Sequence, residues 1–170
     1  MKQLSLEGLN FSTTEVNIKD KIMTITLDRP EKKNAMNNVM MNEINYLLAY
    51  AKQEKDIRVV VFAANGDIFC AGADLSRTES KSNVPRLENS DDISLSLRHL
   101  YKPVICKIQG PVLAGALLIV SNATHAIAVD EATFSAPEIH RGLWPFMVMA
   151  GLFRVMPKRA GLDFIMRGKP

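Results

Sequence analysis

The stretch "VVVFAANGDIFCAGADL", residues 59–75, decides the fold class because a strand pattern and a glycine loop follow one another in it. Residues 58–65 form a short apolar, β-branched run, typical of a strand buried on both faces, and Asn65-Gly66 ends that run. The segment 69–75 then places four small residues in a row, Cys-Ala-Gly-Ala, without a strong acid or base. We expect a loop that presents its backbone, rather than its side chains, to a ligand.

The strand pattern returns twice later in the chain. Residues 102–110 ("KPVICKIQG") repeat it, and residues 112–124 ("VLAGALLIVSNAT") indicate a buried helix with closely packed small residues. Residues 125–130 ("HAIAVD") predict a third buried strand. Because strand and helix patterns alternate, and parallel strands need a crossover between them, the sequence predicts an α/β fold with right-handed crossovers.

Hydrophobic periodicity predicts regular structure on both sides of these units. The turn of an early hairpin is expected at Lys19-Asp20-Lys21, between two alternating runs. A polar, proline-interrupted stretch at 76–92 is expected to be a surface loop. The predicted flanking elements are a β-hairpin within 16–30 and helices at 36–56, 93–101, 145–156 and 158–168.

Composition narrows the class of protein. The chain has 170 residues, 47% hydrophobic and 23% charged, which fits a single globular domain over residues 1–170. Its 21 basic and 18 acidic residues are spread along the whole length, so nucleic acid is a poor candidate partner and an anionic small molecule remains possible. The longest apolar stretch, 110–120, is too short to span a bilayer, so no membrane association is expected.

The cysteines and the N-terminal sequence indicate a reduced compartment. Cys70 and Cys106 lie in apolar surroundings, and the residue pattern offers Cys70 no paired base, so we interpret it as a buried thiol rather than a nucleophile. Residues 1–11 lack the continuous apolar segment of a signal peptide. We therefore expect a cytoplasmic protein.

Two loops rich in glycine and alanine follow buried strands, "FCAGADL" and "GPVLAGALL". In open α/β sheets, ligands bind beyond the carboxyl ends of strands, where small residues let a ligand approach the main chain. Two backbone N–H groups that converge on one ligand oxygen would stabilise negative charge there, as in an oxyanion hole. The alternative interpretation is that both stretches serve only tight packing.

The order of four motifs resembles the crotonase family, the enoyl-CoA hydratases and isomerases. The blocks are "ITLDRPEKKNAM", "VVVFAANGDIFCAGADL", "KPVICKIQGPVLAGALL" and "ATFSAPEIHRGLWP", and together they cover the chain from about Val16 onward. The resemblance implies a crotonase-like fold of repeated ββα units and an acyl-CoA thioester substrate. It implies no metal and no cofactor other than the coenzyme A carried by the substrate.

The same resemblance implies a set of site residues. The oxyanion-hole donors match the backbone N–H groups of Ala73 and Gly115. Basic residues of the turn before the first long helix would meet the phosphates of coenzyme A, and the main chain of the first glycine loop would line its nucleotide. Each lysine taken singly fits a solvated turn about as well. The implied coenzyme A and substrate residues are Arg29, Lys32, Lys33, Ala71, Gly72, Asp74, Leu75 and Ser76.

One departure from the family pattern concerns the catalytic carboxylates. The resemblance implies that hydratases of the family use two catalytic glutamates. Here Leu118 occupies the first of these two positions, and only Glu138 matches the second. A single carboxylate suits transfer of a proton from C2 to C4 of a 3-enoyl thioester better than addition of water. The alternatives are a helix N-terminal role for Glu138 and a catalytically inactive, acyl-CoA-binding remnant or interaction domain. His125 and His140 are interpreted as structural.

A second departure is length. The chain stops at "FIMRGKP", where family members continue with helices that cover the acyl site and build a trimer, so we expect that C-terminal helical region to be largely absent. The last predicted helices are rich in apolar residues, and exposed apolar surface marks partner sites. We therefore expect a homo-oligomer, a trimer or a hexamer built as a dimer of trimers.

Overall fold

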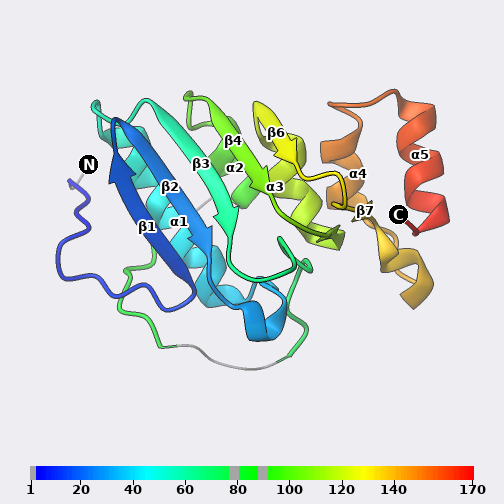
Figure 1. Cartoon of the computed structure of the whole chain (residues 1–170), viewed down its shortest axis with the longest axis horizontal. Helices are drawn as coiled ribbons and strands as arrows, with labels where there is room; N and C mark the ends of the chain where they lie inside the picture. The colour runs from blue at the N-terminus through cyan, green and yellow to red at the C-terminus, as the bar shows by residue number, and fades with distance from the viewer. Residues whose placement is uncertain (1–2, 77–80, 88–91) are drawn as a thin grey trace.

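The computed structural model describes residues 3–76, 81–87 and 92–170, which fold around a five-stranded sheet with helices on one face (Figure 1). The first pair of strands is antiparallel, and every later neighbour in the sheet is parallel. In spatial order the strands are β1 (Thr14–Lys19), β2 (Ile22–Leu27), β3 (Val59–Ala64), β4 (Val104–Ile108) and β6 (His125–Ala128).

The predicted hairpin is present as β1 and β2. Lys19 pairs with Ile22, so the turn has two central residues, Asp20 and Lys21. Both adopt left-handed backbone angles, with φ of +50° and +65°. Two-residue hairpin turns of this kind match the twist of the strands that they join. The Lys-Asp-Lys turn prediction is confirmed.

Three helices cover the rear face of the sheet, α1 (Asn38–Gln53), α2 (Ile93–Arg98) and α3 (Leu117–Asn122) (Figure 1). The first begins where the Asn37 side chain accepts a hydrogen bond from the Met40 N–H, so the asparagine cap and the helix predicted at 36–56 are confirmed. Its apolar side packs into the core between helix and sheet. The fully buried members of that side are Met40, Ile44, Leu47 and Ala51.

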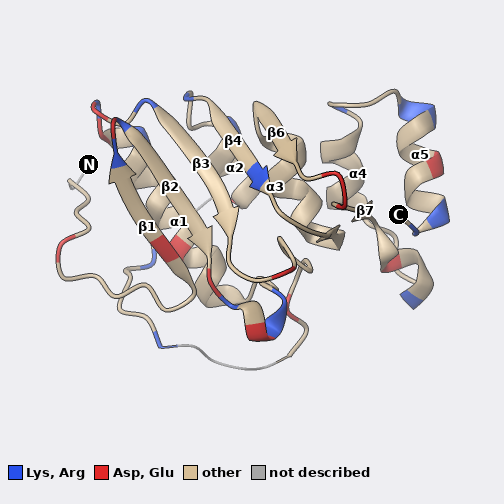
Figure 2. Cartoon of the chain, viewed as in Figure 1, with Lys and Arg blue, Asp and Glu red and all other residues tan. Residues whose placement is uncertain are grey.

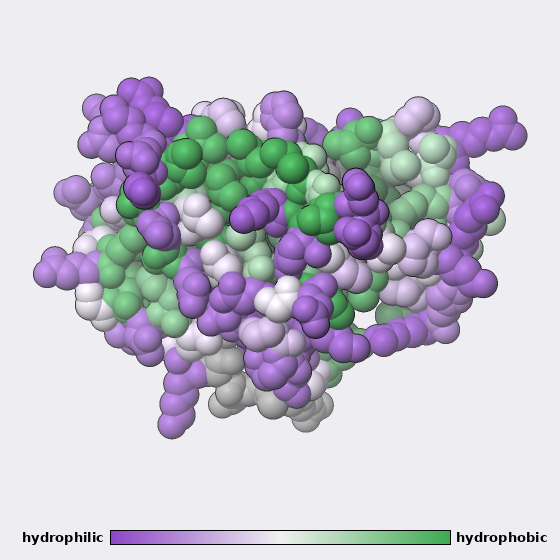
Figure 3. Space-filling view, in the orientation of Figure 1, coloured by the Kyte–Doolittle hydropathy of each residue, from purple (hydrophilic) through white to green (hydrophobic). Residues whose placement is uncertain are grey.

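The strands are buried mainly on the face that the helices cover. In β3, Val60 and Phe62 are fully buried, whereas Val59 and Val61 are half-buried. All four residues of β6 are exposed at the edge of the sheet. The prediction of strands buried on both faces is therefore wrong, because no helix of the described residues lies over the front face, where Figure 3 shows hydrophobic side chains at the surface.

A small second sheet extends the repeating unit. β5 (Val112–Leu113) pairs in parallel with β7 (Phe134–Ser135). The chain thus runs β4-β5-α3 and then β6-β7-α4, with α4 spanning Phe146–Leu152. These are two successive ββα units, as the family resemblance implied.

The helix predicted at 112–124 begins later than expected. Its first two residues form β5, and a 3₁₀ turn, η2 (Ala114–Ala116), precedes α3. The Leu113 N–H donates to the carbonyl of Cys70 at 2.9 Å, and Ala114 has a φ of +53°. This long-range pairing overrides the local preference of the small residues for helix, so the prediction is wrong over its first turn.

The C-terminal part of the chain forms a 3₁₀ turn, η3 (Pro137–Arg141), then α4 and α5 (Lys158–Arg167). The two predicted helices are confirmed, although the first is shorter than the 145–156 expected. Their inner side is buried, but several apolar side chains point outward. More than half exposed are Phe146, Met147, Val155 and Met166. None of the described helices has the length and apolar character needed to cross a membrane.

Candidate active site

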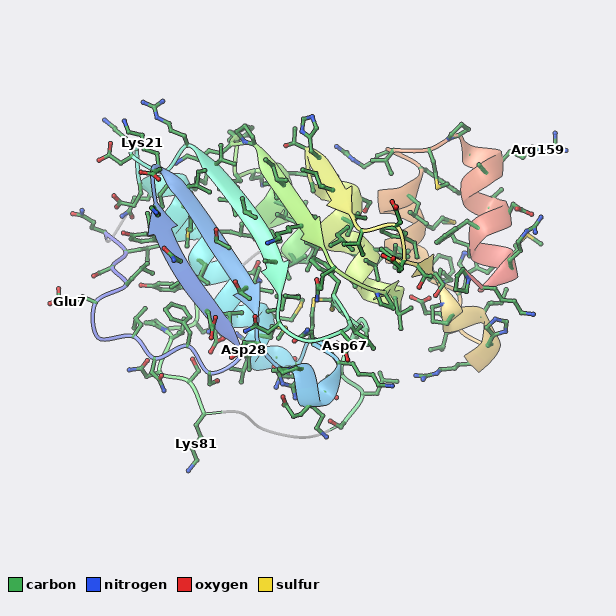
Figure 4. The ribbon with its side chains drawn as sticks, in the orientation of Figure 1. Glu7, Lys21, Asp28, Asp67, Lys81 and Arg159 are labelled. Atoms are coloured by element: carbon green, nitrogen blue, oxygen red, sulfur yellow. The ribbon has the colours of Figure 1, made fainter. Side chains whose placement is uncertain are left out.

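The loops that were predicted to bind a ligand gather at one edge of the main sheet. Figure 4 shows Asp28, directly after β2, and Asp67, in the turn after β3, at this edge, whereas Lys21 at the start of β2 lies at the opposite edge. The carboxyl ends of the parallel strands therefore meet here, which is where open α/β sheets bind ligands.

The first loop, residues 69–76, is held on one side by β5 and the residue before it. The Cys70 N–H donates to the carbonyl of Pro111 (3.4 Å), and the Cys70 carbonyl accepts from the Leu113 N–H (2.9 Å). These two bonds make a parallel bridge between Cys70 and Val112. The first loop is thereby aligned with the start of the second loop, residues 110–116.

On its other side the first loop pairs with Met36. The Met36 N–H donates to the carbonyl of Gly72 (2.7 Å), and the Met36 carbonyl accepts from the Asp74 N–H (2.9 Å). In a parallel bridge of this kind, the residue between the two hydrogen-bonded residues, here between Gly72 and Asp74, points its own N–H and carbonyl away from the opposite strand. Ala73 is that residue: it is exposed, and its N–H has no acceptor within the described residues.

The N–H of Ala73 lies close to Gly115 of the second loop. Gly72 has a φ of +87°, and a Cβ added there would lie 2.9 Å from the Gly115 nitrogen. A Cβ added to Gly115 would in turn lie 3.6 Å from the Ala73 nitrogen. Gly115 is in the first turn of η2, where backbone N–H groups have no partner within the helix. The structure brings the backbones of Ala73 and Gly115 together, and a side chain at Gly72 would crowd the Gly115 nitrogen.

A buried ion pair anchors the first loop to the turn that precedes α1. Arg29 and Asp74 are joined at 3.0 Å, and only 5% and 7% of their side chains are exposed. The other guanidinium nitrogen of Arg29 donates to the carbonyl of Ala35. Arg29 was predicted to meet phosphates of coenzyme A. That prediction is not supported, because its charge is already paired inside the protein.

Acid titration tests this ion pair. The hydroxyl and N–H of Ser76, and then Arg29, hold the pKa of Asp74 at about 2. Because this lies below the value of about 3.9 for an unfolded Asp, the stabilisation is complete above about pH 4 and is lost as the pH falls toward 2. We expect the free energy of unfolding to fall more steeply over this range than in Asp74→Asn. Urea titrations at each pH measure it, and equal pH dependence in the two proteins would contradict it.

The remaining residues predicted to bind coenzyme A lie on the surface around the first loop. Lys32 ends the 3₁₀ turn η1 (Pro30–Lys32) and Lys33 follows it, and both are exposed. Figure 2 shows basic and acidic residues together at this turn. Ala71 is half-buried, whereas Leu75 is 73% exposed and Ser76 is exposed. The Lys33 carbonyl accepts from the Ala71 N–H at 3.0 Å, so this basic turn lies beside the first loop.

Asn34 is a structural residue of the site that the sequence did not reveal. Fully buried, it accepts from the Arg29 N–H (2.8 Å) and donates to the carbonyls of Asn65 and Ile68 (2.8 Å each). It therefore ties the basic turn to the segment that leads into the first loop. Its φ of +53° is a conformation that Asn tolerates better than most residues, and only this preference hinted at its place.

Glu138 lies beyond β7, the strand that pairs with the start of the second loop. Leu113 pairs with Ser135, three residues before Glu138, which sits in η3 behind Pro137. Its Oε2 is buried and has no hydrogen-bond partner in the described part of the chain. Burial raises the pKa of Glu138, against smaller opposing effects of its own backbone N–H and Arg141. The unpartnered Oε2 is available to exchange a proton.

Leu118 stands at the position that the resemblance gives to the first family glutamate. It lies in α3, one turn after Gly115, and is half-buried against the core. Its side chain brings no acid or base to the site. Within the described ranges, no group of three His, Cys, Asp or Glu residues is arranged to hold a metal ion.

The cysteines and histidines lie apart from this chemistry. Both cysteines are buried, and burial raises the pKa of each thiol to about 12. The Cys70 sulfur contacts the carbonyl of Asn34 at 3.0 Å. The prediction that Cys70 is a buried thiol is confirmed. His125, on the edge strand β6, and His140, in η3, are exposed.

Comparison with known proteins places this geometry in a family. The sequence model described as "Enoyl-CoA hydratase/isomerase" matches residues 17–170. The chain belongs to the enoyl-CoA hydratase/isomerase family. It is 33% identical over 154 residues to "Probable enoyl-CoA hydratase EchA12" of Mycobacterium tuberculosis, covering 83% of this chain and 52% of the relative. It is 26% identical over 155 residues to the human "Enoyl-CoA hydratase domain-containing protein 3, mitochondrial", covering 89% and 51%.

The solved structures of the family confirm the crotonase-like fold. An enoyl-CoA hydratase/isomerase from Mycobacterium paratuberculosis superposes with a TM-score of 0.81 at 25% identity, covering 94% of this chain and 64% of that one. The chain spans about half the length of the curated relatives it matches. One of these relatives is named as mitochondrial, so the cytoplasmic location expected from the sequence stays a prediction.

Proposed function

We propose that this family member binds an acyl-CoA thioester and stabilises its enolate between the N–H groups of Ala73 and Gly115. The observation that carries the proposal is the unused Ala73 N–H, turned away from Met36 and placed beside Gly115. An enolate concentrates negative charge on the thioester oxygen, and two preorganised backbone donors stabilise that charge without reorganising. The chain acts as one acyl-CoA-binding domain, with coenzyme A as part of the substrate and no further cofactor.

Glu138 is the proposed proton carrier. Its raised pKa brings the carboxyl closer to neutral pH, where a group both takes and returns a proton most effectively. It would remove a proton from C2 of a 3-enoyl thioester and return it at C4, while the oxyanion hole holds the dienolate. Leu118 supplies no second carboxylate to activate water, so isomerisation is favoured over hydration. The family name covers both reactions.

Coenzyme A would lie across the outer side of the first loop. Exposed Lys32 and Lys33 are available for its phosphates, and the backbone of residues 71–76 for its nucleotide. Arg29 and Asp74 shape that backbone from inside. We further propose a homo-oligomer, a trimer or hexamer, because exposed apolar side chains on α4 and α5 favour burial against another subunit.

A second candidate is a catalytically inactive acyl-CoA-binding protein, favoured by Leu118, which supplies no carboxylate. Calorimetry with crotonyl-CoA, free coenzyme A and crotonate tests what both candidates share. We expect crotonyl-CoA to bind more tightly than crotonate, because the loops recognise the thioester and the lysines recognise phosphate. Equal affinity for crotonyl-CoA and crotonate would overturn the ligand class, and turnover assays then separate the two candidates.

A further inference from the structure

An open hollow of about 230 Å³ is lined by residues of α2, α3 and α4. The first two helices lie behind the sheet, and α4 packs against α3 beyond the edge strand β6 (Figure 1). Two arginines line it, Arg98 at the end of α2 and Arg154 just after α4. Ser94 and Asn122 contribute a hydroxyl and an amide to the same lining. Besides Leu95, Met147, Ala150 and Gly151, the lining thus carries two positive charges and two neutral polar groups, for which the methyl end of a simple fatty acyl chain offers no partner.

Several of these polar groups lack partners in the described part of the chain. Ser94 is 8% exposed, and its buried hydroxyl has no hydrogen bond there. Arg98 and Arg154 are exposed and belong to neither of the ion pairs formed by the described residues. The one carboxylate in the lining, Asp92, accepts from the Leu95 N–H at 2.9 Å and caps α2. The two positive charges therefore remain available to an anion.

The hollow lies along the helix face that begins at the second loop. Gly115, Leu118 and Asn122 follow at intervals of three and four residues, so they share one face over a rise of roughly 10 Å. The Asn122 amide donates to the Leu118 carbonyl at 2.8 Å, which fixes the side chain at the rim. An acyl group whose carbonyl sits at Gly115 would pass Leu118 and reach the hollow with its far end.

We propose that the preferred acyl group of this protein carries a carboxylate at its far end, bound by Arg98 and Arg154. The proposal rests on the proposed function, since it takes the thioester to lie at Ala73 and Gly115. A guanidinium presents paired N–H donors that match a carboxylate, and the Ser94 hydroxyl supplies a further donor inside the hollow. A methyl-ended chain would leave these donors without a partner.

The test compares two substrates of equal length, oct-3-enoyl-CoA and the mono-CoA thioester of oct-3-enedioic acid. We expect kcat/KM to be about tenfold higher for the diacid thioester, the effect of one charged hydrogen-bonded contact. In Arg98→Gln/Arg154→Gln we expect the ratio of the two kcat/KM values to fall to about one. Arg159→Gln is the matched control, because Arg159 is exposed on α5 (Figure 4) and is not among the residues that line the hollow. The single variants replace the double variant if that protein does not fold.

Binding of the saturated counterparts, octanoyl-CoA and the mono-CoA thioester of octanedioic acid, separates the two proposals. If octanoyl-CoA binds at least as tightly, the carboxylate proposal is overturned and the proposed function stands. If neither thioester binds or reacts, the proposed function fails and the carboxylate proposal fails with it. Tighter binding of the diacid thioester without turnover, lost in the double variant, supports the carboxylate site and contradicts only the isomerase activity.

Discussion

Glu138→Gln is expected to lower kcat for isomerisation of 3-hexenoyl-CoA by about 10²–10⁴-fold, the usual contribution of a positioned acid or base. The amide keeps the size of the side chain but cannot carry the proton from C2 to C4. Butyryl-CoA, which has no double bond to move, should bind with nearly unchanged affinity, because the oxyanion donors and the coenzyme A surface are untouched. Stopped-flow or steady-state assays measure kcat for isomerisation, and calorimetry measures the affinity for butyryl-CoA.

Glu131→Gln provides the control, since Glu131 is an exposed acid in the turn between β6 and β7. This variant should leave both kcat for isomerisation and the affinity for butyryl-CoA unchanged. The same assays should show crotonyl-CoA hydration to be slower than isomerisation in the unsubstituted protein. Hydration at the faster rate, unaffected by Glu138→Gln, would show that another group activates water and that Glu138 is not the proton carrier.

The pH profile adds a check on the environment of Glu138. Burial raises its pKa, and the group must be ionised to accept a proton from C2. The rate should therefore fall on acidification at a pH above the ordinary range for a glutamate, near 4.3.

Local patterns predicted most of the fold because each acts within a few residues. The Lys-Asp-Lys turn, the Asn37 cap and the spacing of apolar residues in α1 all depend on neighbouring positions. The partial burial of β3 and the exposure of β6 depend on which face other helices cover, and a short apolar run looks the same in either case. The helix predicted from 112 onward was wrong at its start because Cys70, far earlier in the chain, pairs with β5.

In the candidate site, too, features set by neighbouring residues were predicted and features set by long-range pairing were not. Small residues indicated two loops that present their backbone, and the family resemblance assigned the donors to Ala73 and Gly115. The structure places those two residues side by side. Arg29 was assigned to phosphates because a basic residue in a turn looks solvent-facing. Its partner, Asp74, is 45 residues away, and no periodicity links the two. Residue type predicted the chemistry of the loops, whereas long-range pairing decided which charges remain free.

Gly72→Ala is expected to lower kcat by about 10²–10³-fold, the loss typical of removing one oxyanion donor. A Cβ at this position would lie 2.8 Å from the Cβ of Ala114, 2.9 Å from the Gly115 nitrogen and 3.0 Å from the Leu113 carbonyl oxygen. Two of these atoms belong to the backbone, so the second loop must move away from Ala73. The two N–H groups would then no longer converge on one oxygen.

The φ of +87° at Gly72 adds a conformational cost of roughly 1–2 kcal/mol that is unrelated to the contact. Gly8→Ala isolates that cost, because Gly8 has a φ of +71° and an added Cβ there meets nothing within 4 Å. Urea unfolding should show both variants destabilised, with Gly72→Ala the more so. When the two variants are assayed under conditions in which each is fully folded, only Gly72→Ala should lose activity. If the folded Gly72→Ala protein kept its kcat, the convergence of the two loops would have no part in the reaction, and the oxyanion hole would have to be sought elsewhere in the fold.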